Sequence, residues 1–124
     1  MKFDELTLSQ KAAVREQGSI IVSAAAGSGK TAVLVQRIVD RLTSKENPLS
    51  ADRLLVVTFT VAAAGEMRSR IEKELDTYCK NNLDDKYAAK QKLLIRSAKI
   101  CTIDSFCIDL VRENFAKANV SPDF

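Results

Sequence analysis

Apolar residues recur along this chain in two patterns that follow one another several times. Short apolar runs, rich in β-branched residues, are each followed by a segment in which apolar residues return every three or four positions. The first pattern is typical of strands buried in a parallel sheet, and the second is typical of amphipathic helices. Their alternation predicts an α/β fold with an open parallel sheet flanked by helices.

Three segments carry the strand pattern, at residues 20–23 (IIVS), 54–59 (LLVVTF) and 99–103 (KICTI). The middle segment has no alternating polar positions, so we expect both of its faces to be buried. No repeat and no linker divides the chain, so the three strands are expected to belong to one domain over residues 1–124.

Helical spacing predicts a helix after each strand segment and one before the first. The capping-box spacing of Thr7 and Gln10 predicts a short helix that begins near Ser9 and stops by Gly18. Longer helices are predicted to begin near residues 30, 62, 86 and 103. In the last of these we expect five buried side chains, namely Phe106, Cys107, Leu110, Val111 and Phe115.

Composition narrows the class of protein. The chain has 124 residues, 46% of them hydrophobic and 28% charged, which is typical of one soluble domain. Its net charge of +3 is evenly spread, so any nucleic-acid contact must come from a local site. With no signal peptide and no membrane-spanning run, we expect a cytoplasmic protein without a membrane partner.

Two residue types limit the chemistry further. The chain contains no His, which excludes His-based catalytic triads and His metal sites. Its three cysteines, Cys79, Cys101 and Cys107, show no C-x-x-C spacing, which favours reduced thiols over a zinc site or a disulfide framework.

Residues 24–31 (AAAGSGKT) fit the phosphate-binding loop G-x-x-x-x-G-K-[ST], with Ala24 in place of the first Gly. Backbone N–H groups of such a loop surround a phosphate, and the following helix N-terminus adds partial positive charge. We expect Lys30 on the β- and γ-phosphates of ATP and Thr31 on Mg²⁺. The predicted ATP-binding loop is Ala24, Ala25, Ala26, Gly27, Ser28, Gly29, Lys30 and Thr31. The alternative is a glycine-rich turn with a surface lysine.

Three further segments match a known family in order: residues 8–14 (LSQKAAV), 55–67 (LVVTFTVAAAGEM) and 100–107 (ICTIDSFC). With the phosphate loop, they make the chain resemble the N-terminal part of UvrD/Rep-type superfamily 1 DNA helicases. Within that family it is most similar to the AddA/RexA group, the A-type subunits of the bacterial ATP-dependent helicase/nuclease. The resemblance implies a RecA-like P-loop NTPase fold that is incomplete in this chain, with ATP and Mg²⁺ as cofactors.

Segment 8–14 resembles the family's Q motif. The resemblance implies that Gln10 pairs its amide with the N6 and N7 edge of adenine, a geometry that the donors and acceptors of the base favour. The alternative is that Gln10 only closes the capping box. Relatives often carry Arg directly after the loop Thr, whereas this chain has Ala32; Arg37 lies one face further along and is interpreted as a solvated helix residue.

Segment 55–67 resembles motif Ia, and the resemblance implies that Thr58, Phe59 and Thr60 contact single-stranded DNA. Hydroxyls and amides at a strand end and helix start suit phosphate oxygens. Burial of the apolar side chains in a core is the alternative.

Segment 100–107 resembles motif Ib, often T-x-H-S-F, and the resemblance implies DNA contacts from Thr102, Ser105 and Phe106. Phe106 is equally suited to the core. Asp104 stands where His is usual. Because a carboxylate repels phosphate, we expect Asp104 to cap the following helix instead.

Hydrolysis also needs a Walker B carboxylate pair and an arginine finger, and neither is recognisable here. We therefore expect part of a larger ATP-dependent DNA helicase/nuclease that translocates on single-stranded DNA in double-strand-break repair and recombination. The resemblance implies a second helicase/nuclease subunit, of the B type, as partner, and the 124 residues alone are expected to be inactive. The alternatives are a short non-catalytic nucleotide-binding or interaction module and, more remotely, a small P-loop kinase.

Overall fold

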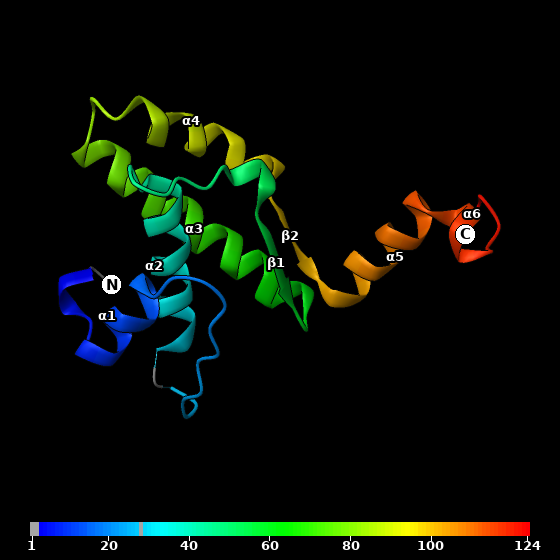
Figure 1. The fold of residues 1–124 in the computed structure, drawn as a ribbon, viewed down its shortest axis with the longest axis horizontal. Helices are drawn as coiled ribbons and strands as arrows, with labels where there is room; N and C mark the ends of the chain where they lie inside the picture. The colour runs from blue at the N-terminus through cyan, green and yellow to red at the C-terminus, as the bar shows by residue number, and fades with distance from the viewer. Residues whose placement is uncertain (1–2, 28) are drawn as a thin grey trace.

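The computed structural model describes residues 3–27 and 29–124. Single strands separate pairs of helices along the chain (Figure 1). In order they are α1 (Leu8–Arg15), α2 (Lys30–Thr43), β1 (Leu55–Thr58), α3 (Val61–Asn81), α4 (Lys86–Leu94), β2 (Lys99–Thr102), α5 (Ile103–Glu113) and α6 (Phe115–Ala118). Short 3₁₀ turns lie at Phe3–Glu5, Ala51–Arg53 and Ile95–Ser97.

Strands β1 and β2 form a parallel sheet, which has these two strands within the described residues. Val56 lies opposite Ile100 and Thr58 opposite Thr102, so both strands end at the same edge. Helices α3 and α4 make the crossover, as a parallel pair requires. The expected parallel α/β arrangement is confirmed for these two strands.

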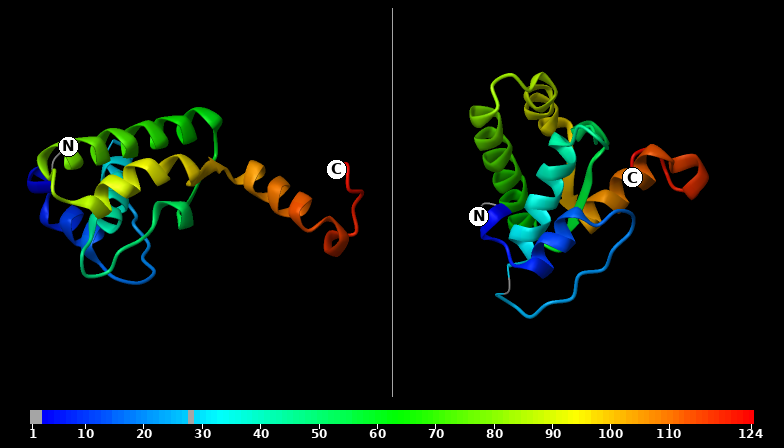
Figure 2. Two further views of the ribbon diagram at one scale, coloured as in Figure 1. Left: turned by 90° about the horizontal axis from the view of Figure 1, so that it is seen from above. Right: turned by 60° about the vertical axis from the view of Figure 1, so that its left-hand side comes forward.

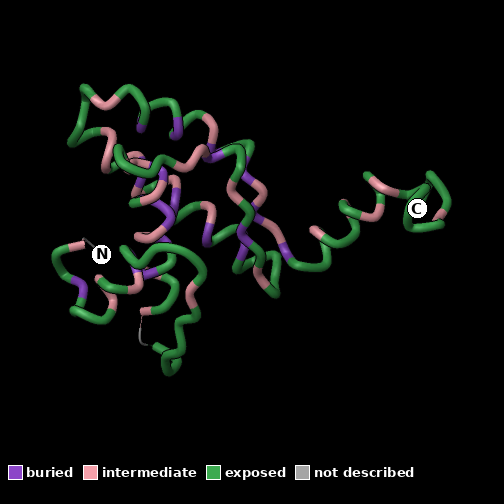
Figure 3. The backbone as a smooth tube through the Cα atoms, viewed as in Figure 1, coloured by how far each residue is buried: buried purple, intermediate pink, exposed green. Residues whose placement is uncertain are grey.

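The main core lies where α2, α3 and α4 meet the sheet, and the buried backbone positions concentrate there in Figure 3. Leu42, Ile71 and Leu75 are fully buried at its centre. Its other members are Val35, Ile38, Val39, Ala51, Val56, Met67, Ile95, Ala98 and Ile100. The three-to-four residue spacing seen in the sequence therefore forms the packed faces of α2 and α3.

A second, smaller cluster joins α1 to the start of α2. It contains Leu6, Val14 and Val33, with Phe3 and Ala13 packed against it. The capping box that begins α1 is confirmed, because the Thr7 N–H donates to Gln10 Oε1 at 2.9 Å and the Gln10 N–H donates to Thr7 Oγ1 at 3.3 Å. We call the segment from Phe3 through α1, the loop that follows it and the first turns of α2 the N-terminal unit.

Charged side chains join α3 to α4 at the surface. Asp76 on α3 accepts hydrogen bonds from Lys80, at 2.6 Å, and from Lys92 on α4. These two ammonium groups lower the pKa of Asp76 from 3.8 to about 2. Within the described part of the chain, no helix is both long enough and apolar enough to cross a membrane.

The predicted strand at 20–23 is wrong. These residues follow α1 as an irregular segment, and Figure 2 shows it as part of a loop that bows away from the helices before α2 begins. Ile21 is 97% exposed and Val22 48% exposed. A strand needs a hydrogen-bonded neighbour, and within the described residues β1 and β2 pair only with each other.

Two burial predictions are also wrong. β1 is buried on one face only, because α3 packs against the sheet while Leu55, Val57 and Phe59 stay exposed. α5 has no buried residue and projects away from the rest of the molecule in Figure 1. Leu110 and Phe115 carry the expected apolar stripe, yet no described element covers it.

Candidate functional site

The phosphate-loop segment turns sharply into α2 through two glycines. Gly27 has φ +77° and Gly29 has φ +84°, values in the left-handed region that other residues adopt only with strain. Gly29 is the N-cap of α2, so the first N–H groups of that helix point out of the end of the loop. Ser28 lies outside the described residues, so its predicted contact stays a prediction.

Lys30 lies across the loop that precedes it. Its Nζ donates to the carbonyl oxygen of Ala24 at 2.7 Å, which ties the first residue of the motif to the start of α2. An ammonium group has three donors, so two remain for other acceptors. Thr31 follows in the first turn of α2 and is exposed.

Gln10 is brought beside this loop by α1. A Cβ added at Gly29 would lie 3.3 Å from Gln10 Nε2, so the Gln10 amide lies next to the space beside Gly29 at the N-terminus of α2. The same amide accepts the Thr7 N–H through Oε1. Gln10 therefore closes the capping box while its amide nitrogen faces the loop, and the adenine contact stays a prediction.

Arg37 is not the solvated helix residue that its position suggested. Its guanidinium donates to four carbonyl oxygens at the end of α1, those of Ala13, Val14, Glu16 and Gly18, at 2.9, 3.3, 2.7 and 3.3 Å. The sequence carries no local signal for this contact, because the partners lie 19 to 24 positions away. Tertiary packing alone identifies Arg37 as part of the site's framework.

The carboxyl edge of the sheet gathers the predicted hydroxyls. Thr58 and Thr102 end β1 and β2 opposite each other, with Thr60 and Ser105 close behind in sequence. Thr58 donates to the Thr60 carbonyl at 2.9 Å, and Thr102 donates to Ser105 Oγ at 2.9 Å. The Thr60 and Ser105 hydroxyls act as acceptors at this edge, so each still has a hydrogen that it can donate outward.

The two threonines that precede the helices are their caps. Thr60 Oγ1 accepts the Ala63 N–H at 3.1 Å, and Thr102 Oγ1 accepts the Ser105 N–H at 3.1 Å. The expected capping role of Asp104 is therefore wrong. Asp104 lies in the first turn of α5, where its negative charge interacts favourably with the partial positive charge of the helix N-terminus.

The two predicted aromatic contacts differ in accessibility. Phe59 is 93% exposed directly after β1, so its ring is free to stack. Phe106 is partly buried, and Lys99 Nζ lies 5.8 Å from its ring centre. Lys99 also lies 3.7 Å from Asp109 and 3.7 Å from Glu113, so these charges surround one edge of α5.

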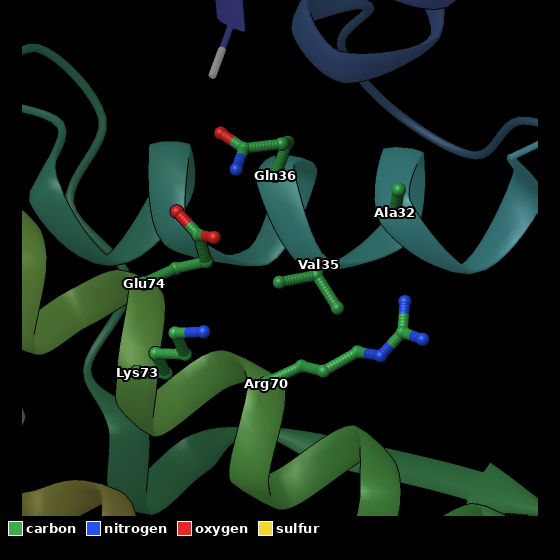
Figure 4. Close-up of a pocket in the computed structure, with 6 residues that line it drawn as sticks. All are labelled: Ala32, Val35, Gln36, Arg70, Lys73 and Glu74. Carbon is green, nitrogen blue, oxygen red and sulfur yellow. The ribbon is translucent and has the colours of Figure 1, made fainter. Parts of the chain in front are cut away.

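A pocket of about 300 Å³ adjoins the phosphate loop between α2 and α3 (Figure 4). It begins one residue after Thr31, and it is lined by Ala32, Val35, Gln36, Arg70, Lys73 and Glu74. Arg70 also pairs with Glu66 at 2.7 Å. The small side chain of Ala32 borders this space. Of the predicted ATP-binding residues that the structure describes, none lines it.

Metal-binding side chains are sparse around the loop. Among the described residues, no three His, Cys, Asp or Glu side chains lie close enough to hold a metal ion. Cys79, Cys101 and Cys107 are free, and burial raises the pKa of the Cys79 thiol. A cation at the loop would therefore depend on the Thr31 hydroxyl and on ligands other than a cluster of three His, Cys, Asp or Glu side chains.

Comparison with known proteins agrees with the motifs. Residues 6–124 match the family model of the UvrD/REP helicase N-terminal domain. The A-type subunit of the ATP-dependent helicase/nuclease of Thermoanaerobacter sp. strain X514 is 52% identical over 119 residues, which are 95% of this chain and 10% of that protein.

Two other relatives have the same name. The protein of Clostridioides difficile strain 630 is 49% identical over 86% of this chain and 8% of its own length, and that of Exiguobacterium sibiricum is 48% identical over 93% and 10%. The chain thus spans about a tenth of the length of these curated relatives. The resemblance found in the motifs is confirmed: the chain belongs to the family of UvrD/REP helicase N-terminal domains.

Proposed function

We propose that this chain is the ATP-binding N-terminal segment of an ATP-dependent DNA helicase/nuclease with a RecA-like P-loop fold. The full-length enzyme would translocate on single-stranded DNA in double-strand-break repair and recombination, together with a B-type subunit. One observation carries the proposal: the amide of Gln10 on α1 lies beside Gly29, the N-cap of α2 that directly precedes Lys30. A base-reading amide and a phosphate-binding loop are thereby adjacent, as recognition of an adenine nucleotide requires.

The loop chemistry follows from these positions. The N–H groups at the start of α2 and the ammonium of Lys30 would hold phosphate oxygens, because both present positive charge at the same end of the helix. Lys30 would exchange its bond with the Ala24 carbonyl for phosphate contacts. The half-buried amide of Gln10 would then meet the base.

The metal requirement is modest for this kind of site. Mg²⁺ supplies charge neutralisation at the phosphates and is commonly held by one or two protein oxygens plus phosphate oxygens. Thr31, exposed in the first turn of α2, would supply one hydroxyl. The described residues hold no cluster of three metal-binding side chains, so a carboxylate from another part of the enzyme would complete the site.

Substitution of Lys30 tests the nucleotide site. In the full-length enzyme, Lys30→Ala should lower the ATPase rate by roughly 10²-fold or more, because a positioned cation is lost from the developing phosphate charge. Lys45→Ala, in the exposed loop after α2, is the matched control and should keep the wild-type rate. Wild-type turnover by Lys30→Ala would exclude the phosphate loop assignment.

The carboxyl edge of the sheet would be the DNA shelf. Thr60 and Ser105 can donate hydroxyl hydrogens to phosphate oxygens, and the exposed Phe59 ring can stack on a base. Hydroxyls and a single ring carry little sequence information. With a net charge of +3, the segment should bind single-stranded DNA weakly, without base preference, and less as salt rises.

A DNA titration of the ATPase tests this shelf. Thr60→Ala with Ser105→Ala should raise the oligonucleotide concentration for half-maximal stimulation several-fold while the DNA-free rate stays nearly unchanged. Because Thr60→Ala also removes a helix cap, Asp85→Ala, which removes the cap of α4, is the control. Equal shifts in the double variant and in Asp85→Ala would mean that loss of a helix cap, and not loss of a DNA-contacting hydroxyl, explains the change.

A short non-catalytic nucleotide-binding module is the second candidate, favoured by the lack of an acidic cluster among the described residues. The purified 124 residues distinguish the two candidates poorly, because both predict no hydrolysis. The full reading frame does so directly: continuation into an Asp-Glu pair after a buried strand and into arginine motifs selects the enzyme.

A further inference from the structure

Helices α1 and α2 face each other through two matched rows of side chains. On α2, Gly29, Val33 and Arg37 are four residues apart and therefore lie on one face. On α1, Gln10 and Val14 have the same spacing. The rows meet in order, since Gln10 lies against Gly29, Val14 packs with Val33, and Arg37 bonds the end of α1.

The contact of Arg37 is directional. The last carbonyl groups of a helix have no partner within it, and the helix end carries partial negative charge. The guanidinium satisfies Ala13 and Val14 at this end, and it also reaches Glu16 and Gly18 in the turn that follows. Because the guanidinium of Arg37 is planar and bonds four carbonyl groups, it fixes both the position of α1 along α2 and the rotation of α1 about its own axis.

Apolar packing alone would hold α1 less firmly. Val14 and Val33 are small side chains, and the cluster they form contains three buried residues. This contact resists separation of the two helices, but sliding of α1 along α2 would cost little free energy. Because Gln10 lies one turn before Val14, a shift of α1 along α2 would carry the Gln10 amide away from Gly29.

We propose that Arg37 is a positioning residue for nucleobase selection: by holding the carbonyl end of α1, it keeps the Gln10 amide beside the phosphate loop. The inference rests on the proposed function and deepens it. It separates two parts of the site, since the loop that binds phosphate belongs to α2 itself and does not need α1. Loss of Arg37 should therefore weaken base discrimination and spare phosphate binding.

The test is calorimetric titration of the full-length protein with ADP, GDP and pyrophosphate in the presence of Mg²⁺. Arg37→Lys keeps the positive charge and a long aliphatic chain but lacks the planar guanidinium. It should therefore lower the ADP-to-GDP affinity ratio by roughly five- to tenfold. Arg37→Met should lower it at least as much. Both variants should bind pyrophosphate within about twofold of the wild type.

Controls separate positioning from general damage. Arg41→Lys lies one turn further along α2, and Arg41 Nε is buried without a hydrogen-bond partner among the described residues, so this variant should keep the wild-type ratio. Gln10→Ala should lower the ratio to the same extent as Arg37→Lys. The double variant should show no additional loss, because both changes disable one contact.

Each alternative result has one meaning. A wild-type ratio in Arg37→Lys and Arg37→Met, with a reduced ratio in Gln10→Ala, overturns the positioning role and leaves the proposed function intact. An equal decrease for ADP, GDP and pyrophosphate assigns Arg37 to general stability and also overturns it. Unchanged pyrophosphate binding in Lys30→Ala, or unchanged discrimination in Gln10→Ala, would instead remove the proposed nucleotide site.

Discussion

The main core and the N-terminal unit hold their elements by different means. In the main core, large side chains such as Leu42, Ile71 and Leu75 are fully buried between helices and sheet. In the N-terminal unit, Val14 is the fully buried member of a three-residue cluster, and polar contacts from Arg37, Thr7 and Lys30 complete it. The residues with predicted nucleotide chemistry therefore lie where apolar burial is small, which is typical of functional loops with low local stability.

The largest effect is expected from truncation in the main core. Leu75→Ala should lower the free energy of unfolding of the 124-residue chain by about 2–5 kcal/mol, because it leaves a cavity among fully buried neighbours. Leu93→Ala on α4, where the side chain is 76% exposed, should change it by less than about 0.5 kcal/mol. Urea-induced unfolding measures both. Similar losses in the two variants would contradict the assignment of the core.

Truncation of a side chain in the N-terminal unit should lower the free energy of unfolding by less, and its effect on hydrogen exchange should stay within that unit. Val14→Ala should lose about 2 kcal/mol, since a smaller apolar group is removed from a small cluster. Hydrogen exchange should become faster at Leu8–Arg15 while α3 keeps its protection. Faster exchange in both segments would show that the two regions unfold as one unit.

Alanine substitution at three glycines separates the destabilisation caused by backbone strain from that caused by a side-chain contact. Gly29→Ala should destabilise the chain by about 1–2 kcal/mol, because φ is +84° and the new Cβ would press on Gln10 Nε2. Gly18→Ala has a similar positive φ but nothing within 4 Å, so it should cost less. Gly65→Ala, inside α3 and equally open, should stabilise by about 0.5–1 kcal/mol. Thermal unfolding ranks the three, and an equal cost at Gly29 and Gly18 would argue against the Gln10 contact.

The smallest effect belongs to the surface charges that join α3 to α4. The pKa of Asp76 is lowered to about 2, so its carboxylate contributes stability above pH 4 that is lost as the pH falls toward 2. Asp76→Asn should therefore lower Tm slightly at pH 7 and have a smaller effect near pH 2. The difference in Tm between variant and wild type, followed from pH 7 to pH 2, checks the sign. A difference in Tm that keeps the same size from pH 7 to pH 2 would assign the effect to packing instead.

The candidate site was partly predictable. The positions of Gly27, Gly29 and Lys30 follow from a motif whose residues are adjacent in sequence, and their backbone agrees with the sharp turn that such a loop needs. The capping box of Thr7 and Gln10 also depends on a spacing of three. Arg37 was not predictable, because its partners belong to another helix and nothing local distinguishes it from a solvated arginine.

By itself the sequence determined the features that arise within one or two helical turns: where α1, α3 and α4 begin, which stripes are apolar, and where the glycine-rich loop leads into a helix. Tertiary structure decided which of these stripes are used. Residues 20–23 have the composition of a strand yet form none, and the apolar stripe of α5 stays exposed. Strand pairing and helix burial both need a partner segment that lies far away in the sequence. Caps and periodicity are set by neighbours along the chain, whereas pairing and burial are set by whatever the fold brings alongside.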